Sequence, residues 1–313
     1  MAFFIGIDAG GSKTRCALGD EERVLATALT SSCKIQRVGE DEARRALHNV
    51  IQEVCKIAGV PARGIEHACI GISGASDSGV VERVRSILGE VISAPADVVG
   101  DMIIALEAGL GSGPGCILVA GTGSIAVGRD EHGHLARVGG WGPTVSDEGS
   151  GYWIGRAAVG AVLRAHDSGK STALASAITQ AWGLSTYEDF VLAASAAPPP
   201  DFAQLFPIVL EEAAQGDPMA GEILKRAGIE LAELALIVIR RLWPGQHQVR
   251  VVVSGGVFEN SQVTREVFAN TLRNAFPQIA VSLGNMEPVM GALSLARRQH
   301  SAISSQHSAP KQG

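Results

Sequence analysis

Two stretches of this 313-residue chain share one pattern, and that repetition constrains the fold more than any other feature. The stretches are IGIDAGGSKTRCAL (residues 5–18) and LVAGTGSIAVG (118–128). Each contains an apolar strand, a turn of small residues with a hydroxyl, and a second apolar strand. A third glycine pair, Gly255-Gly256, follows another apolar stretch. Two matching halves predict a duplicated α/β fold with a nucleotide bound in the cleft between them.

The hydrophobic spacing along the chain predicts the remaining elements. We expect strands at 3–8, 14–20, 23–29, 67–75 and 96–101, and helices at 40–58 and 79–88. Residues 116–140 predict three strands with a hairpin at Glu131–His134, and a helix starts within 146–166. Residues 171–247 are expected to be mostly helical, and 248–260 to form a strand, a glycine turn and a helix start. We place domains at 1–115 and 116–298, with a disordered tail at 299–313.

Composition suits a soluble cytoplasmic protein. The formal charge is −6, with no long basic run, which argues against nucleic acid or an anionic membrane as a partner. The five cysteines are scattered without a CxxC motif, as expected of reduced thiols. We expect neither a signal peptide nor a membrane span, because no suitable apolar run is present.

The first turn has the residues of a phosphate-binding loop. Gly10 and Gly11 allow the backbone to approach a ligand, and Ser12 and Thr14 add hydroxyls beside the exposed N–H groups. Asp8 would repel a phosphate but suits Mg²⁺ held through water. The alternative is a plain tight hairpin in which Asp8 only bonds turn N–H groups.

Three other patterns resemble catalytic motifs but lack essential parts. GIDAGGSKT differs from a Walker A loop, because its lysine follows the serine and a strand follows the loop. GISGA (71–75) resembles a nucleophile elbow, but a hydrolase would need a triad histidine and His67 lies in the preceding strand. His132 and His134 flank a glycine in an expected hairpin and have no evident third metal ligand.

Five segments between residues 3 and 298 resemble one family. The chain is similar to the N-acetylglucosamine and glucosamine kinases of the BadF/BadG-type ATPase family, within the actin/hexokinase-like (ribonuclease H-like) superfamily. The matching segments are GIDAGGSKTR, VAGTGS, VSGGVFEN, AAQGDPMAGEILKRAG (213–228) and, most specifically, GGWGPTVSDEGSGYWIG (139–155). The resemblance implies a two-domain α/β fold, ATP with Mg²⁺, and a homodimer.

The resemblance places the catalytic base at Asp101, which ends ADVVGD just before a helix. A phosphoryl acceptor hydroxyl needs a carboxylate to orient it and take its proton. The alternative is that Asp101 is a helix N-cap.

The resemblance also implies the residues that contact the two substrates. The phosphates and adenosine are expected at Gly10, Gly11, Ser12, Lys13, Thr14, Gly121, Thr122, Gly123, Gly255, Gly256 and Asn260. The sugar is expected at Lys34, Asp101, Ser124, Gly140, Trp141, Asp147 and Glu148. Three alternatives stay open: Asp147 and Glu148 as first-turn helix acids, Trp141 as a core residue, and Asn260 on a helix surface.

The segment 30–39 departs from the family pattern, because it has no asparagine where the group binds the sugar. Lys34 or Gln36 would take that place, and a charged lysine would repel a free amino sugar. The expected activity is transfer of the ATP γ-phosphate to the 6-hydroxyl of N-acetylglucosamine, with glucosamine as the alternative. An activator ATPase would need cysteines for an iron–sulfur cluster. A sugar-responsive regulator would normally carry a DNA-binding helical unit before the first strand.

Overall fold

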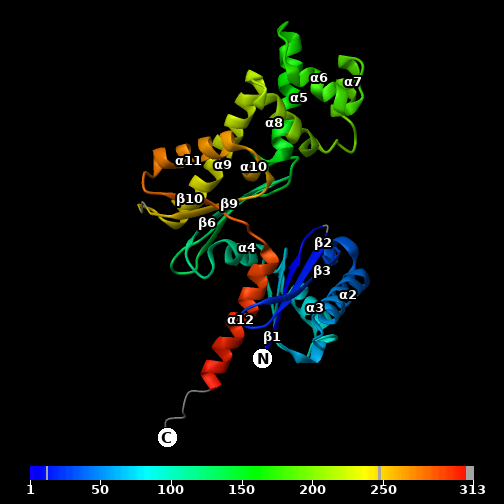
Figure 1. Ribbon diagram of the computed structural model, residues 1–313, viewed down its shortest axis with the longest axis vertical. Helices are drawn as coiled ribbons and strands as arrows, with labels where there is room; N and C mark the ends of the chain where they lie inside the picture. The colour runs from blue at the N-terminus through cyan, green and yellow to red at the C-terminus, as the bar shows by residue number, and fades with distance from the viewer. Residues whose placement is uncertain (12, 246–247, 308–313) are drawn as a thin grey trace. The chain divides into compact units, whose positions relative to one another are not determined.

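The computed structural model describes residues 1–11, 13–245 and 248–307, which form two compact units (Figure 1). The first unit combines Met1–Ser112 with the chain from Met286 onward, and the second comprises Gly113–Asn285. Each unit is built on a five-stranded sheet.

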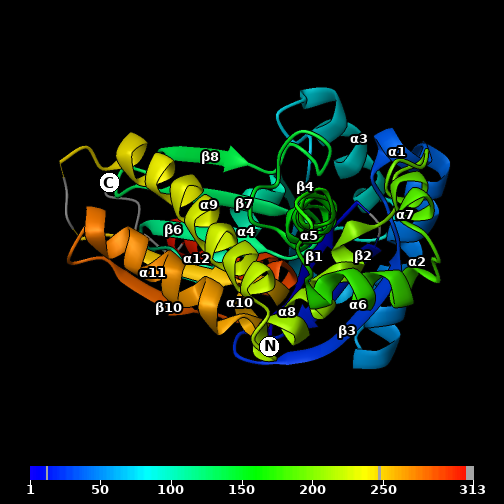
Figure 2. The same cartoon turned by 90° about the horizontal axis from the view of Figure 1, so that it is seen from above.

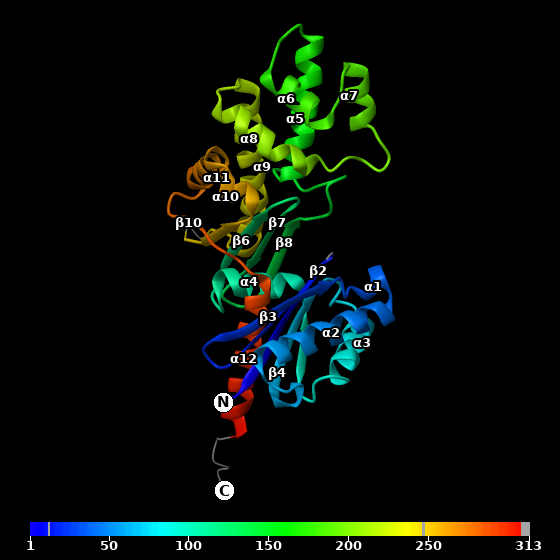
Figure 3. The ribbon, with the colours of Figure 1, turned by 45° about the vertical axis from the view of Figure 1, so that its right-hand side comes forward.

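The first unit places helices on both faces of its sheet (Figure 3). Its strands are β1 (Phe3–Ala9), β2 (Lys13–Gly19), β3 (Val24–Ser31), β4 (Ile65–Ile72) and β5 (Ala96–Val99). Its helices are α1 (Ile35–Val38), α2 (Glu40–Ala58), α3 (Ser78–Gly89), α4 (Asp101–Leu110) and α12 (Pro288–His307), with a 3-10 turn η1 at Ala62–Gly64. Helices α2 and α3 cover one face with a large apolar core, and α4 and α12 cover the other.

The second unit adds a group of helices between its third and fourth strands (Figures 1 and 2). Its strands are β6 (Gly115–Ala120), β7 (Ser124–Arg129), β8 (Leu135–Gly139), β9 (Arg250–Ser254) and β10 (Ala280–Leu283). Its helices are α5 (Gly151–Asp167), α6 (Ala173–Trp182), α7 (Tyr187–Ala194), η2 (Phe202–Leu205), α8 (Phe206–Ala214), α9 (Pro218–Leu242), α10 (Gly256–Asn260) and α11 (Gln262–Ala275). Helix α9 packs on β6, β7 and β8 and against α11.

The two sheets have the same topology, which confirms the predicted duplication. Their orders are β3-β2-β1-β4-β5 and β8-β7-β6-β9-β10. In each sheet the first three strands in sequence pair antiparallel, and the last two join in parallel. The carboxyl ends of the parallel strands therefore meet at one edge of each sheet, where the glycine turns also lie.

The C-terminal segment corrects the expected domain boundaries. We expected residues 286–298 in the second domain, but helix α12 packs on β1 and α4 of the first unit. Gly6 allows this approach, because a Cβ there would lie 2.2 Å from the backbone nitrogen of Leu293. Glu107 of α4 also pairs with Arg298 at 2.5 Å. Sequence spacing shows that a segment is an amphipathic helix but not which sheet covers it.

The expected disordered tail also differs from the structure. Helix α12 continues through His307, past residue 299, and residues 308–313 lie outside the described part of the chain. The helix still contacts the sheet at His300, whose ring lies edge-on to Phe4 of β1 with 5.3 Å between the ring centroids.

The five cysteines are free and buried, as expected of reduced thiols. Burial raises the pKa of Cys69 and of Cys116 to about 12. A thiol with so high a pKa is not a nucleophile near neutral pH. Among the helices in the described ranges, none is both long and apolar enough to cross a bilayer.

Candidate functional site

The first glycine turn joins β1 to β2 after the Ala9–Thr14 strand pair. Gly10 must be glycine, because a Cβ there would lie 2.8 Å from the carbonyl oxygen of Lys13. Gly11 and Lys13 are exposed, while Ser12, also predicted here, lies outside the described residues. The exposed backbone of this turn can meet an anionic ligand.

The segment that follows β3 holds this turn in place. The Ser32 hydroxyl donates to the Gly10 carbonyl at 3.2 Å, and the Arg37 guanidinium donates to the Gly11 carbonyl. The Thr14 hydroxyl accepts the Cys33 N–H at 3.1 Å and is completely buried. This corrects the predicted role of Thr14: it anchors the loop from inside and does not face a phosphate.

Two carboxylates lie at the carboxyl edge of the first sheet. Asp8 pairs in register with Gly71 of β4, and Gly71 pairs with Val99 of β5, two residues before Asp101. Burial raises the pKa of Asp8, nearby Arg15 lowers it, and the charge of Asp101 raises it. The two acids are therefore within electrostatic reach, and oxygen donors of this kind suit Mg²⁺.

Asp101 is the exposed first residue of α4, and Gly100 takes the N-cap position. The alternative of an N-cap aspartate therefore does not hold. Its Oδ1 accepts only the N–H of Met102, at 2.9 Å, among the described groups. The second carboxylate oxygen accepts no hydrogen bond from the described groups.

Lys34 is half-buried and directly precedes the short helix α1, which the sequence did not predict. On that helix the Gln36 amide nitrogen would be 3.2 Å from a Cβ at Gly74. The segment without asparagine thus lies beside the turn that follows β4. Lys34 and Gln36, the two residues proposed to replace the family's asparagine, are both on this segment.

The second glycine turn joins β6 to β7 and is bonded to the start of α5. The Gly121 carbonyl accepts the Gly151 N–H at 2.8 Å, and the Thr122 carbonyl accepts the Tyr152 N–H at 3.3 Å. Within the turn, the Gly121 N–H donates to the Gly123 carbonyl at 2.9 Å. The Thr122 side chain remains exposed. The first N–H groups of a helix have no partner within the helix, and here those of α5 hold this loop in place.

Asp147 lies between this loop and the GGWG segment. Its carboxylate accepts backbone N–H groups from Ser124 and, at 3.4 Å, from Gly142. A Cβ at Gly123 would lie 2.7 Å from Oδ2, so glycine is needed where the carboxylate rests. Burial raises the pKa of Asp147, which is only 5% exposed. A carboxylate has about four lone-pair sites, so capacity for a ligand hydroxyl remains.

Neither acid of the DEGS segment lies in a helix, so the first-turn alternative is wrong. Helix α5 begins at Gly151 with Ser150 as its N-cap, and Asp147 has a left-handed φ of 63°. The Glu148 carboxylate accepts from the Ser146 hydroxyl at 3.2 Å. Ser124, expected at the sugar, is buried and donates to the Glu148 carbonyl at 2.7 Å. Ser124 therefore stabilises the DEGS segment by this buried hydrogen bond.

Trp141 is 68% exposed, which excludes the core alternative. The Arg137 guanidinium lies 4.5 Å from its ring centroid and donates to the Gly140 carbonyl at 2.5 Å. Arg137 also lowers the pKa of Asp147, against the larger effect of burial. Arg137 was not predicted to be a site residue, because no motif marks it. The one signal in the sequence is its position two residues before the glycine pair, where β8 ends.

The third glycine pair follows β9 and lies beside the second turn. Gly255 has a φ of 100°, and a Cβ there would lie 2.5 Å from the Ala120 carbonyl oxygen. Gly256 begins α10, and the side chain of Asn260, at the end of that helix, donates back to the Gly256 carbonyl at 2.8 Å. Asn260 is exposed, as its helix-surface alternative predicts.

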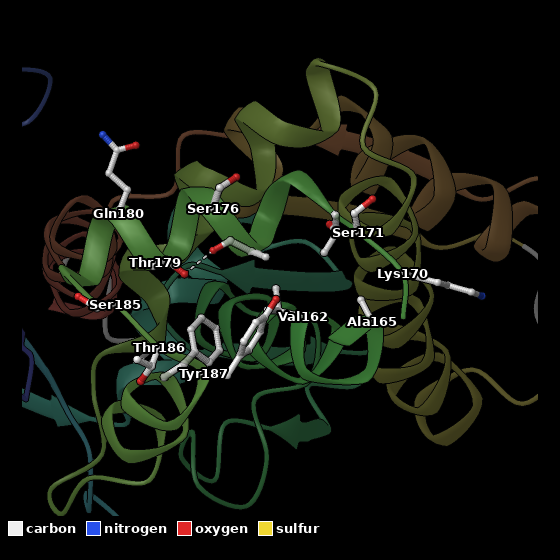
Figure 4. A pocket seen from close by; sticks show the side chains of 13 residues that line it. Val162, Ala165, Lys170, Ser171, Ser176, Thr179, Gln180, Ser185, Thr186 and Tyr187 are labelled. Carbon is white, nitrogen blue, oxygen red and sulfur yellow. Dashed lines mark hydrogen bonds between the residues drawn. The ribbon is translucent and has the colours of Figure 1, made fainter. Parts of the chain in front are cut away.

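A cavity of about 590 Å³ lies among α5, α6 and α7 of the second unit, and none of its lining residues belongs to the glycine turns (Figure 4). Three of its hydroxyls are bonded locally: Thr179 to the Ala175 carbonyl, Ser176 to the Ala173 carbonyl, and Thr186 to the start of α7. Lys170 and Gln180 extend away from it (Figure 4). No polar groups converge there, so we assign it no function.

The histidines of the β7–β8 hairpin have a structural role. Asp130 accepts the backbone N–H groups of His132 and His134 and pairs with the His134 ring at 2.8 Å. No group of three potential metal ligands occurs within residues 1–11, 13–245 and 248–307. Turn formation explains why these residues cluster.

Comparisons with known proteins agree with this geometry. A model of the BadF/BadG/BcrA/BcrD ATPase family matches residues 5–296. The N-acetylmuramic acid/N-acetylglucosamine kinase of Clostridium acetobutylicum is 32% identical over 309 residues, covering 96% of this chain and 99% of that protein. The N-acetyl-D-glucosamine kinase of Dictyostelium discoideum is 32% identical over 314 residues, covering 94% and 97%.

A solved structure supports the fold. The crystal structure of a Chromobacterium violaceum protein proposed to be an N-acetylglucosamine kinase is 27% identical, with a TM-score of 0.71. The match covers 95% of this chain and 99% of that one. The expected two-domain α/β fold of the sugar kinases is confirmed.

Proposed function

The chain belongs to the BadF/BadG/BcrA/BcrD ATPase family as an amino-sugar kinase, and we propose that it transfers the γ-phosphate of ATP to the 6-hydroxyl of N-acetylglucosamine. One observation carries the proposal: the exposed Asp101 carboxylate shares a sheet edge with Asp8, at the end of the strand that opens into the first glycine turn.

Asp101 acts as the general base. Its free carboxylate oxygen accepts the proton of the 6-hydroxyl and orients the oxygen for attack on the γ-phosphate. Its other oxygen is bonded to the start of α4, which fixes the direction of the carboxylate. Replacement by asparagine should lower kcat by about 10²–10⁴-fold.

The glycine turns hold the phosphates. Backbone N–H groups around Gly10, Gly11 and Lys13, and those around Thr122, can donate to phosphate oxygens. The neighbouring Gly255-Gly256 turn is proposed to lie against the adenosine. Asp8 would hold Mg²⁺, which neutralises charge on the transferred phosphate when bound.

The sugar is proposed to lie against the GGWG and DEGS segments. Gly140 and the exposed Trp141 would form one wall, and Asp147 and Glu148 would accept sugar hydroxyls. Lys34, half-buried before α1, is also proposed to contact the sugar. A charged lysine repels a free ammonium but not a neutral acetamido group, which favours N-acetylglucosamine over glucosamine. We also propose a cytoplasmic location, where ATP is available, and a homodimer, as the family resemblance implies.

The test is ADP release with Mg-ATP across a panel of acceptors. The panel contains N-acetylglucosamine, glucosamine, N-acetylmannosamine, N-acetylmuramic acid, glucose and no sugar. N-acetylmuramic acid is included because the Clostridium relative is named for it. We expect the highest kcat/KM with N-acetylglucosamine and strong loss in the Asp101→Asn enzyme. Equal rates without sugar, or undiminished turnover by Asp101→Asn, would refute the proposal.

A further inference from the structure

A groove between α5 and α9 in the second unit gathers three arginines. It has a volume of about 460 Å³ and is lined by Arg156 and Arg164 of α5 and by Arg226 of α9. The two helices pack against each other, α5 among the green helices and α9 in yellow in Figure 3. This volume is within the usual range for small-molecule sites.

The spacing of residues on both helices forms the groove. On α5 the lining positions recur every three or four residues from Trp153 to Arg164, so they share one face. Its floor there consists of Ala157, Gly160 and Ala161, and a Cβ at Gly160 would meet no atom within 4 Å. Small side chains therefore leave the space open between the long arginines.

The arginines of this groove have no anionic partner. Across the described ranges of the chain, Arg156, Arg164 and Arg226 form no salt bridge or hydrogen bond through their guanidinium groups. The guanidinium of Arg226 lies over the Trp153 ring, 5.6 Å from its centroid. The single acid of the lining, Glu222, is 3.9 Å from Lys225.

This arrangement is unusual for a chain with a net charge of −6. Like charges around one groove repel, and each guanidinium offers five N–H donors in a planar fork. An anion with several oxygens would relieve the repulsion and accept these donors. A phosphate suits them better than a single carboxylate, because its three terminal oxygens can bond more than one guanidinium.

We propose that this groove is a second ligand site, which binds a small phosphomonoester. The arginines bind the phosphoryl oxygens, and the face of Trp153 with the small-residue floor takes the organic part. The site uses no residue proposed for ATP or for the acceptor sugar.

The position of the groove links it to the second glycine turn. Gly151 and Tyr152, which donate to the carbonyls of that turn, directly precede Trp153 on α5. A ligand that shifts or stiffens the first turns of α5 therefore acts on a loop proposed to hold phosphate. We expect occupancy to change the KM for ATP; this consequence alone rests on the proposed function.

The experiment is isothermal titration with N-acetylglucosamine 6-phosphate, inorganic phosphate and, as a neutral probe, N-acetylglucosamine. A non-hydrolysable ATP analogue and N-acetylglucosamine are kept in excess in the phosphate titrations to occupy the proposed catalytic site. The test enzyme is Arg156→Ala/Arg226→Ala. The control, Arg83→Ala/Arg240→Ala, loses the same charge at exposed positions outside the groove.

We expect one saturable phosphomonoester site, bound at least about tenfold more weakly by the groove variant and equally by the control variant. Inorganic phosphate should compete, and the neutral sugar should not. Equal affinity in both variants, or no saturable binding, would overturn the proposal. Thermal unfolding of both variants should match the wild type, because all four side chains are exposed.

Direct binding does not depend on turnover, so this site and the kinase reaction can fail separately. In the working kinase, the phosphomonoester should change the KM for ATP at least twofold in the wild type and in the control, but not in the groove variant. A KM that stays constant in all three enzymes would reject the link through α5.

Discussion

The two glycine turns share a sequence pattern and a strand topology, but different forces hold them. The first turn is held by two side chains from the segment after β3: the exposed Arg37 guanidinium and the Ser32 hydroxyl, whose hydrogen bond is partly buried. Two like-charged acids lie beside this turn. The second turn is held by the buried Asp147 carboxylate and by the first amides of α5. Duplication thus preserved the loop, while its surroundings diverged.

This difference assigns the two loops different tasks. The first lies beside Asp8 and Asp101, and burial together with the charge of Asp101 raises the pKa of Asp8. The second is a rigid frame, because a buried charge with satisfied hydrogen bonds resists movement. Mutations should therefore affect folding mainly through the second loop and activity mainly through the first.

Asp147→Ala should have the largest effect on stability. It leaves two backbone N–H groups without their acceptor and puts alanine at a φ of 63°, so we expect a loss of about 2–4 kcal/mol in the free energy of unfolding. The sugar KM should rise about tenfold, and more than the KM for ATP. Urea unfolding and steady-state kinetics measure both. Asp147→Asn, which keeps one acceptor oxygen and tolerates this φ, should lose less; an equal loss would contradict the role of the hydrogen bonds.

Gly123→Ala should have the next largest effect. The new Cβ would press on Asp147 Oδ2 from 2.7 Å, and such overpacking costs about 1–3 kcal/mol. Gly121→Ala in the same turn is the matched control, because a Cβ there would meet no atom within 4 Å. Differential scanning calorimetry should show a lower Tm for the first variant and a nearly unchanged one for the second. Equal shifts would mean that the carboxylate does not fix this loop.

The sequence predicted the repeated loops and the duplicated sheets, but the strands predicted at 67–75 and 96–101 end earlier, at Ile72 and Val99. The loops and sheets follow from local patterns: apolar runs, glycine turns and acids at strand ends. It could not predict that Thr14 and Ser124 point inward, since a hydroxyl in a turn suits both a ligand and a backbone bond. Arg137 and helix α12 were missed or misplaced, because their contacts join segments far apart in sequence.

Arg37→Ala tests how the first loop is held. The guanidinium binds the Gly11 carbonyl from an exposed position, so its loss should change the free energy of unfolding by less than about 0.5 kcal/mol. The KM for ATP should nevertheless rise several-fold, because the turn loses a contact at its tip. Arg63→Ala, another exposed arginine of the first unit, should change neither value. A large stability loss with an unchanged KM would reverse the assignment of the two loops.

Asp8→Asn should produce the smallest change in the free energy of unfolding, and it should stabilise the protein where the other variants destabilise it. Burial and the charge of Asp101 raise the pKa of Asp8 above its ordinary 3.8, so folding makes its ionised form less favourable. The stability tied to this group is present below pH 3.8 and is lost as pH rises through the raised value. Asparagine carries no such cost, so the variant should gain about a few tenths of a kcal/mol at pH 7.

This gain should fade as pH falls toward 3.8, where the wild-type carboxyl takes up its proton. Urea unfolding of both proteins across this range measures the difference, with the exposed Glu53→Gln as a control for general charge loss. Activity should fall while stability rises, because an amide binds Mg²⁺ more weakly than a carboxylate does. A fully active variant with no stability gain would contradict this prediction. It would show that burial does not destabilise the ionised Asp8 and that Mg²⁺ does not need its carboxylate.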